Sequence, residues 1–170
     1  MRRLGVVVAC AISLGALGVP AATSAPSQSP RLVAPPATLV QYGYVRSLVR
    51  SGNGYRMRFD PALWLSGQTA NRAAIEDGVI ARGETVPNDY YIRNESRRQL
   101  SYTVLPSAGV TVVTNSAVGG LRATRISVPE LAAIVAGRNP NRRRLYGRDL
   151  GYWIRVAGDR VTRLDQHYQP

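Results

Sequence analysis

Apolar and polar positions alternate along much of the chain, which is the pattern of β-strands with one buried face. Residues 44–50 (YVRSLVR) and 55–60 (YRMRFD) flank the segment SGNG, whose glycines suit the positive-φ positions of a tight turn. Near the C-terminus, residues 152–156 (YWIRV) and 160–168 (RVTRLDQHY) flank a Gly158-Asp159 turn in the same way. The pattern therefore predicts a hairpin at each end of the folded region.

In residues 55–60 the alternation directs the apolar side chains to the core (Tyr55, Met57, Phe59) and the charged ones to solvent (Arg56, Arg58, Asp60). Residues 60–67 (DPALWLSG) are expected to turn, because Pro61 and Gly67 restrict the backbone. Within this segment, Trp64 is expected to cap one end of the fold rather than to contact a ligand.

The middle of the chain predicts more strands and an irregular connector. Residues 79–89 are the connector, and residues 89–94 (DYYIRN) and 99–105 (QLSYTVL) are extended segments. PSAG is expected to turn the chain into the strand VTVVT at residues 110–114.

Two short helices are predicted. The first is TANRAAIED, with Thr69 as its N-cap and Gly78 as the residue that ends it. The second is VPELAAIVAG, which begins after a capping box formed by Ser127 and Glu130 and ends at Gly137.

This order of elements predicts a mainly β (α+β) fold, namely a small OB-like barrel of five strands. One capped helix precedes the last hairpin, and residues 60–89 form a helical insertion after strand two. A plain α+β sheet with packed helices is the alternative.

The first 25 residues have the features of a secretory signal peptide: Arg2 and Arg3, then an apolar run, then Pro20 and small residues. Residues 26–41 are rich in proline and small residues and are expected to form a flexible tether to a single domain at 42–170. The predicted location is secreted or extracellular, with association with the cell wall as a further option and without a membrane span in the mature chain. Cys10 is the only cysteine, so the mature chain would have none.

The charge balance is strongly basic, with 22 basic residues, all arginine, against 10 acidic ones. Loss of Arg2 and Arg3 leaves 20 basic residues against 10 acidic residues in the mature chain. An excess of arginine suits an anionic partner. The absence of lysine is also what the codon bias of a GC-rich genome produces.

Few residues offer catalytic or metal-binding chemistry. His167 is the only histidine and lies close to the C-terminus, where an exposed strand position is expected. No cofactor or metal site is predicted. A possible acidic site comprises Asp60, Glu76 and Asp77. The last two occupy the final turn of the first helix, where the helix dipole disfavours negative charge. Pairing of Glu76 with Arg72 is expected to offset this. The alternative is that the carboxylates meet a partner, a cation or an arginine elsewhere in the fold.

The binding candidates combine aromatic and arginine side chains. In DYYIRN two adjacent tyrosines cannot both face the core, and Tyr91 with Arg93, flanked by Asp89, is the pair expected to be available for contacts. Trp153 beside Arg155 is able to stack on a sugar or base if it faces outward. Arg56 and Arg58 would extend a basic face, together with Arg163 and the loop 142–144.

The segments FDPALWLSG, AAIEDG, VPNDYYIRN, GYWIRV and LDQHYQP resemble those of a group of uncharacterised exported actinobacterial proteins. The resemblance covers most of residues 42–170. It implies a discrete secreted domain and carries no activity and no site residue with it. The chain departs from the group at NRRRLYGRD, which puts a functional role of this loop in doubt.

The function expected from these features is that of an exported, non-catalytic binding domain at the cell envelope or outside the cell. Its partner would be an anionic wall polymer, a polysaccharide or another envelope protein, contacted through an arginine and aromatic face. A small carboxylate-dependent hydrolase is the alternative. Nucleic acid is a less favoured partner, because the chain is expected to be exported.

Overall fold

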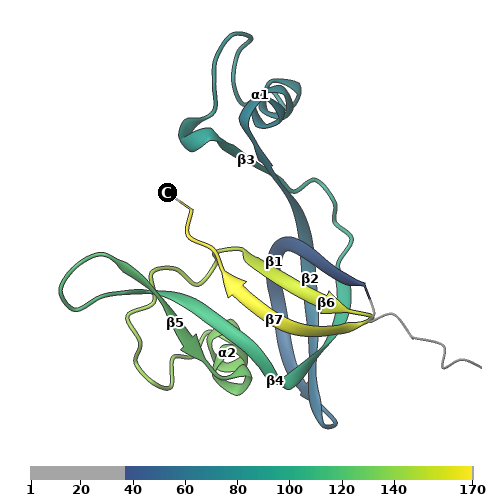
Figure 1. Ribbon diagram of the computed structural model, residues 1–170, viewed down its shortest axis with the longest axis vertical. Helices are drawn as coiled ribbons and strands as arrows, with labels where there is room; N and C mark the ends of the chain where they lie inside the picture. The colour runs from purple at the N-terminus through teal and green to yellow at the C-terminus, as the bar shows by residue number, and fades with distance from the viewer. Residues whose placement is uncertain (1–36, 170) are drawn as a thin grey trace, which may run out of the picture. The chain divides into compact units, whose positions relative to one another are not determined.

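The computed structural model describes residues 37–169, which all belong to one compact unit (Figure 1). The predicted signal peptide and most of the predicted tether lie outside the described residues. Neither of the two described α-helices has the length and apolar character of a membrane-spanning helix.

Five strands close into a barrel. They are β1 (Thr38–Ser51), β2 (Gly54–Ser66), β4 (Leu100–Asn115), β6 (Tyr152–Ala157) and β7 (Arg160–Gln166). The order around the barrel is β2-β1-β6-β7-β4, and β4 returns to pair with β2. Only the β4–β7 pair is parallel. The predicted OB-like barrel of five strands is therefore confirmed.

Five further elements extend the barrel. The insertion after β2 contains α1 (Gly67–Glu76), the short 3₁₀-helix η1 (Pro87–Asp89) and β3 (Tyr90–Arg93), which pairs with the end of β2. On the other side, β5 (Leu121–Ile126) pairs with β4, and α2 (Val128–Val135) packs on β4 and β1. Figure 1 shows α1 beside β3, at the end of β2 that lies away from the β1–β2 turn.

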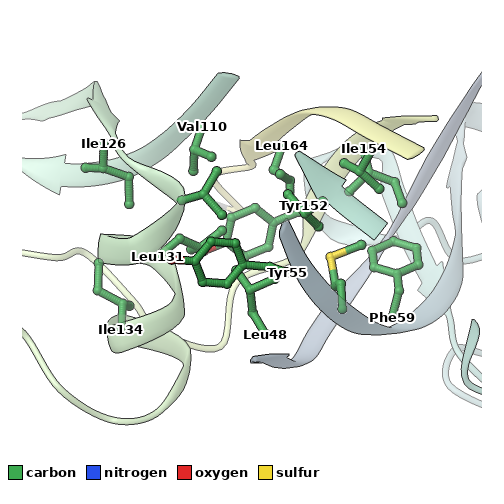
Figure 2. Packing of buried hydrophobic residues seen from close by; sticks show 14 of the residues in the cluster. Leu48, Tyr55, Phe59, Val110, Ile126, Leu131, Ile134, Tyr152, Ile154 and Leu164 are labelled. Atoms are coloured by element: carbon green, nitrogen blue, oxygen red, sulfur yellow. The ribbon is translucent and has the colours of Figure 1, made fainter. Parts of the chain in front are cut away.

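The barrel interior is packed with apolar side chains from every barrel strand and from α2 (Figure 2). Met57 and Phe59 have no exposed surface, as the alternation in β2 predicts, and Tyr55 is also buried. Leu131 extends the core onto α2 and is fully buried as well. Truncation of such a side chain to alanine typically costs about 3 to 5 kcal/mol.

Three strand predictions were wrong in their bounds. β1 begins at Thr38, four residues before the domain boundary placed at residue 42. β2 continues through DPALWLS as far as Ser66, because β3 supplies a new partner for residues 63–66 after β4 has ended its pairing at Phe59. β4 runs through PSAG without a turn. A register shift between Val104 and Gly109 accommodates the extra residues against β7.

Local patterns predicted the helix caps only in part and missed strand β5. α1 begins at Gly67 after Ser66, so Thr69 is not its N-cap, whereas Gly78 has the positive φ of 69° expected after the helix end. Ser127 Oγ accepts the N–H of Glu130 as predicted. The Glu130 carboxylate, however, binds Arg143. Strand β5 was not predicted, although the paired glycines before it are a hairpin signal.

Candidate functional site

A concave surface lies where β1 and β2 separate. The two strands are paired as far as Tyr42 and Ala62. Beyond this pair, β1 continues as residues 38–41 beside β6, while β2 continues as residues 63–66 beside β3. The groove between them has a volume of about 630 Å³. It is lined by Leu39, Val40, Gln41, Tyr42, Pro61, Ala62, Leu63, Trp64, Arg93, Glu95, Ser96 and Trp153.

Aromatic rings form one wall of this groove. Tyr42 and Trp153 are direct partners in the β1–β6 ladder, so their side chains share the outer face of the barrel, with ring centroids 5.1 Å apart. Trp64 on β2 lies 5.1 Å from Tyr42 and stacks on Tyr90 of β3 at 4.5 Å and 9°. The cluster therefore ties β1, β2, β3 and β6 together and gives the groove a rigid aromatic surface.

A glycine makes room for this cluster. A methyl group on Gly151 would overlap the ring of Tyr42, so no larger residue fits at position 151 while Tyr42 keeps its place. The Tyr42 hydroxyl accepts a hydrogen bond from the Gln169 side chain. Burial raises the pKa of Tyr42, so this hydroxyl stays neutral and acts only as a hydrogen-bonding group.

The prediction that His167 is an exposed strand residue was wrong. His167 follows β7 and is half-buried, with its ring edge-on to Trp64 at a centroid distance of 4.7 Å. Its backbone N–H donates to the carbonyl of Gly151 at 2.9 Å. Burial lowers the pKa of His167, because removal of the ring from water disfavours its charged form. The chain's one histidine is therefore part of the aromatic cluster.

Tyr91 and Arg93, the pair expected to be available for contacts, are turned to α1. The Tyr91 hydroxyl donates to Asp77 Oδ2 at 2.9 Å, and Arg93 donates to Asp77 and to Glu76. Arg93 Nη2 also donates to the Ala73 carbonyl at 2.9 Å. Within the described residues, the ion pair of Glu76 is thus with Arg93 and not with Arg72.

This network explains the two carboxylates at the end of α1. Arg93 places positive charge where the helix dipole is negative, and the carboxylates bind the guanidinium from the other side. Hydrogen bonds from Arg93 hold the pKa of Asp77 below its usual range. Asp89, the third residue of this candidate patch, is exposed on η1. The network's polar groups bind one another and fix α1 to β3.

Asp60 was expected to face solvent, and this prediction was wrong, because only 7% of its surface is exposed. Arg46, on the bulge in β1, donates to its carboxylate at 2.9 Å and 2.5 Å. Asn94, which follows β3, donates to the same oxygen at 3.1 Å. These side chains cover a carboxylate that strand alternation alone would leave in water.

The remaining arginine candidates are spread over the barrel. Arg56 and Arg58 are exposed on β2, as predicted, and Arg56 shares a register position with Thr103 of β4, whose other partner is Arg160 of β7. Arg155 is exposed on β6, opposite Val40 on one side and Arg163 on the other. Only Arg155 therefore lies beside the groove, since Val40 is a lining residue.

The groove is suited to holding a ligand, but few of its lining residues carry groups that transfer protons in catalysis. Its ionisable lining residues are Tyr42, Arg93 and Glu95, and Arg93 lies 3.5 Å from the Glu95 carboxylate. In residues 37–169 no group of three or more histidine, cysteine or carboxylate side chains is placed to hold a metal ion.

Sequence reasoning did not find the groove. Of the predicted binding residues, Trp153 and Arg93 line it, whereas Trp64 was expected to cap the fold. Leu39, Val40 and Leu63 were not among the predicted site residues. Comparison with protein-family models, curated proteins and solved structures finds no match for this chain. The resemblance to exported actinobacterial proteins therefore stays a prediction.

Proposed function

We propose that the chain is an exported, non-catalytic binding domain and that its ligand occupies the aromatic groove between β1 and β2. The groove carries this proposal. It combines a volume of about 630 Å³ with a wall of Tyr42, Trp64 and Trp153. Sites for small molecules and polymer segments are typically concave and mostly apolar, with a few polar groups that orient the ligand.

The apolar side chains around the groove support a binding role. Leu39, Val40 and Leu63 are 51%, 53% and 59% exposed, and all three line the same groove. Scattered exposed apolar residues are ordinary, but a cluster on a concave surface is typical of an interaction site. Wall polymers, polysaccharides and envelope proteins are the ligands to test.

The two tryptophans of the chain provide the assay, because Trp64 and Trp153 both line the groove. A ligand that enters the groove should change their fluorescence, and titration gives its dissociation constant. The ligands are soluble oligosaccharides, an anionic wall polymer and peptides, each measured at low and at moderate salt. A dissociation constant that changes little with salt indicates binding by the aromatic wall. A dissociation constant that rises steeply with salt indicates binding by the arginines.

Two matched variants locate the site. Leu63→Glu places a charge in the groove, and Val49→Glu places the same charge at a residue that is 62% exposed but does not line the groove. Leu63→Glu should weaken binding about tenfold or more, whereas Val49→Glu should leave it unchanged. Equal effects of both variants, or binding without a fluorescence change, would contradict the groove as the site.

The structure gives the hydrolase alternative no specific support. Its proposed carboxylates are each held by an arginine, Asp60 by Arg46 and both Glu76 and Asp77 by Arg93. A general acid needs a raised pKa, whereas the pKa of Asp77 is lowered by its hydrogen bonds from Arg93.

A further inference from the structure

The separation of β1 and β2 leaves two strand edges without backbone partners. Residues 38–41 of β1 pair with β6 on one side, and residues 63–66 of β2 pair with β3 on one side. The sheet order places β3 on the side of β2 that faces away from β1. Among the described residues, no backbone hydrogen bond reaches the other edge of either segment. Both of these edges belong to segments that line the groove.

An unpaired strand edge presents alternating N–H and C=O groups, which are a template for another strand. Proteins usually protect such edges with charged residues or proline. The edge strand β5 carries Arg122 and Arg125. By contrast, residues 38–41 (TLVQ) and 63–66 (LWLS) contain no charged residue and no proline. Neither segment has the usual protection against strand addition.

We infer that the groove accepts an extended peptide, which adds as a short strand to the open edges of β1 and β2. This inference rests on the proposed function and names its ligand class. A peptide supplies the backbone donors and acceptors that both edges lack, and its alternate side chains reach the aromatic wall. An oligosaccharide stacks on Trp64 and Trp153 but does not provide the regular ladder of amide groups.

The charges beside the groove favour an acidic peptide. Arg155 faces outward next to Val40, and Arg97 lines a second pocket that shares Glu95 and Ser96 with the groove. Neither guanidinium has an ion pair or hydrogen bond among the described residues. Arg93 is already bound by Glu76, Asp77 and Glu95. The guanidinium groups of Arg155 and Arg97 are therefore the ones that remain to complement carboxylates on the ligand.

A second copy of this chain fits the edges less well. Each copy carries a large excess of arginine over carboxylate, so two copies repel each other. Four residues of edge also span only about 13 Å, which suits a short peptide better than a stable dimer interface.

The test is a selection from a displayed library of random twelve-residue peptides against the full chain. Leu63→Glu is the counter-selection target, and Val49→Glu is the matched control. The best peptide is then synthesised in two forms, unmodified and N-methylated at alternate residues. Each form is titrated against ¹⁵N-labelled protein to follow amide chemical shifts. A hexamer of β-1,4-linked N-acetylglucosamine is titrated in parallel.

The expected result is enrichment of acidic peptides whose binding shifts the amides of residues 38–41 and 63–66. N-methylation should weaken binding about tenfold or more, because each methyl removes a backbone donor. Equal affinity of the methylated peptide would overturn strand addition. Enrichment of no peptide, or shifts only at other residues, would also overturn it.

If the oligosaccharide binds in the groove while peptides fail, the proposed function stands and the inference about its ligand falls. If wild type and Leu63→Glu bind every probe alike, the groove itself is not the site.

Discussion

Replacement of Arg143 by alanine should destabilise the fold, although this residue lies in a surface loop. Arg143 donates to both carboxylate oxygens of Glu130, and the second of these bonds is 3.1 Å long. Glu130 is 8% exposed, so the variant leaves a nearly buried carboxylate without its counter-ion. Unit charges about 4 Å apart near a protein surface attract by about 4 kcal/mol. Since 29% of the Arg143 side chain is exposed and water can replace part of this interaction, we expect a net loss of about 2 kcal/mol.

The measurement is urea unfolding at neutral pH together with thermal unfolding, where this loss corresponds to a drop in Tm of roughly 6 to 10 °C. Arg144→Ala is the matched control, because Arg144 is the next residue, is exposed and has no ion pair among the described residues. The double variant Glu130→Gln, Arg143→Ala should recover more than half of the loss, since a neutral amide needs no counter-ion. Equal stability of Arg143→Ala and Arg144→Ala would refute the reasoning.

The same pair predicts a pH dependence. Hydrogen bonds from Arg143 hold the pKa of Glu130 below its ordinary value of 4.5, so this pair stabilises the fold above pH 4.5. The contribution is lost as the pH falls through the lowered pKa. The difference between wild type and Arg143→Ala should therefore be full at pH 7 and shrink below pH 4.5. A difference that stays constant over this range would mean that the variant acts through packing alone.

Three other predictions concern the insertion, the aromatic cluster and the barrel. Arg93→Met should reduce hydrogen-exchange protection in α1 and β3 but not in the barrel strands, whereas Arg72→Met should change neither region. Because burial lowers the pKa of His167, its protonation opposes folding, and stability should rise with pH from the lowered pKa up to about 6.5. His167→Phe should abolish that slope in urea unfolding between pH 5 and pH 7. Gly43→Ala should cost about 3 kcal/mol in the same assay, because the new methyl meets the Phe59 ring at 2.8 Å and backbone atoms of β2. An unchanged midpoint in Gly43→Ala would contradict that close packing.

The barrel could be predicted because its signals are local. Alternation in residues 55–59 shows which side chains enter the core, and glycines mark the turns of both hairpins. Ser127 caps α2 through a hydrogen bond that spans three residues. Such short-range preferences, together with the order of the elements, leave few ways to bury the apolar faces. The OB-like strand order is one of them.

Charge pairing could not be predicted in the same way. The sequence shows Arg93, Arg143, Asp60 and Glu130 without their partners, and neither the burial nor the partners of these residues follow from neighbouring positions. Arg93 reaches Asp77 across 16 residues, and Arg143 reaches Glu130 across 13. Which arginine serves the fold and which stays free for a partner depends on how α1 and α2 pack, and alternation does not contain that information.

The sequence by itself determined a basic, strand-rich chain with one barrel, two short helices and no local catalytic motif. Only the tertiary structure decided where the candidate site lies. Trp64 and Trp153 are far apart in the chain and meet because β6 pairs with β1 beside the start of the β1–β2 separation. The β1–β2 pairing ends at Tyr42 and Ala62, and beyond it β1 is held by β6 and β2 by β3, which the insertion supplies. The groove and its open edges are a consequence of that long-range pairing, which no local pattern specifies.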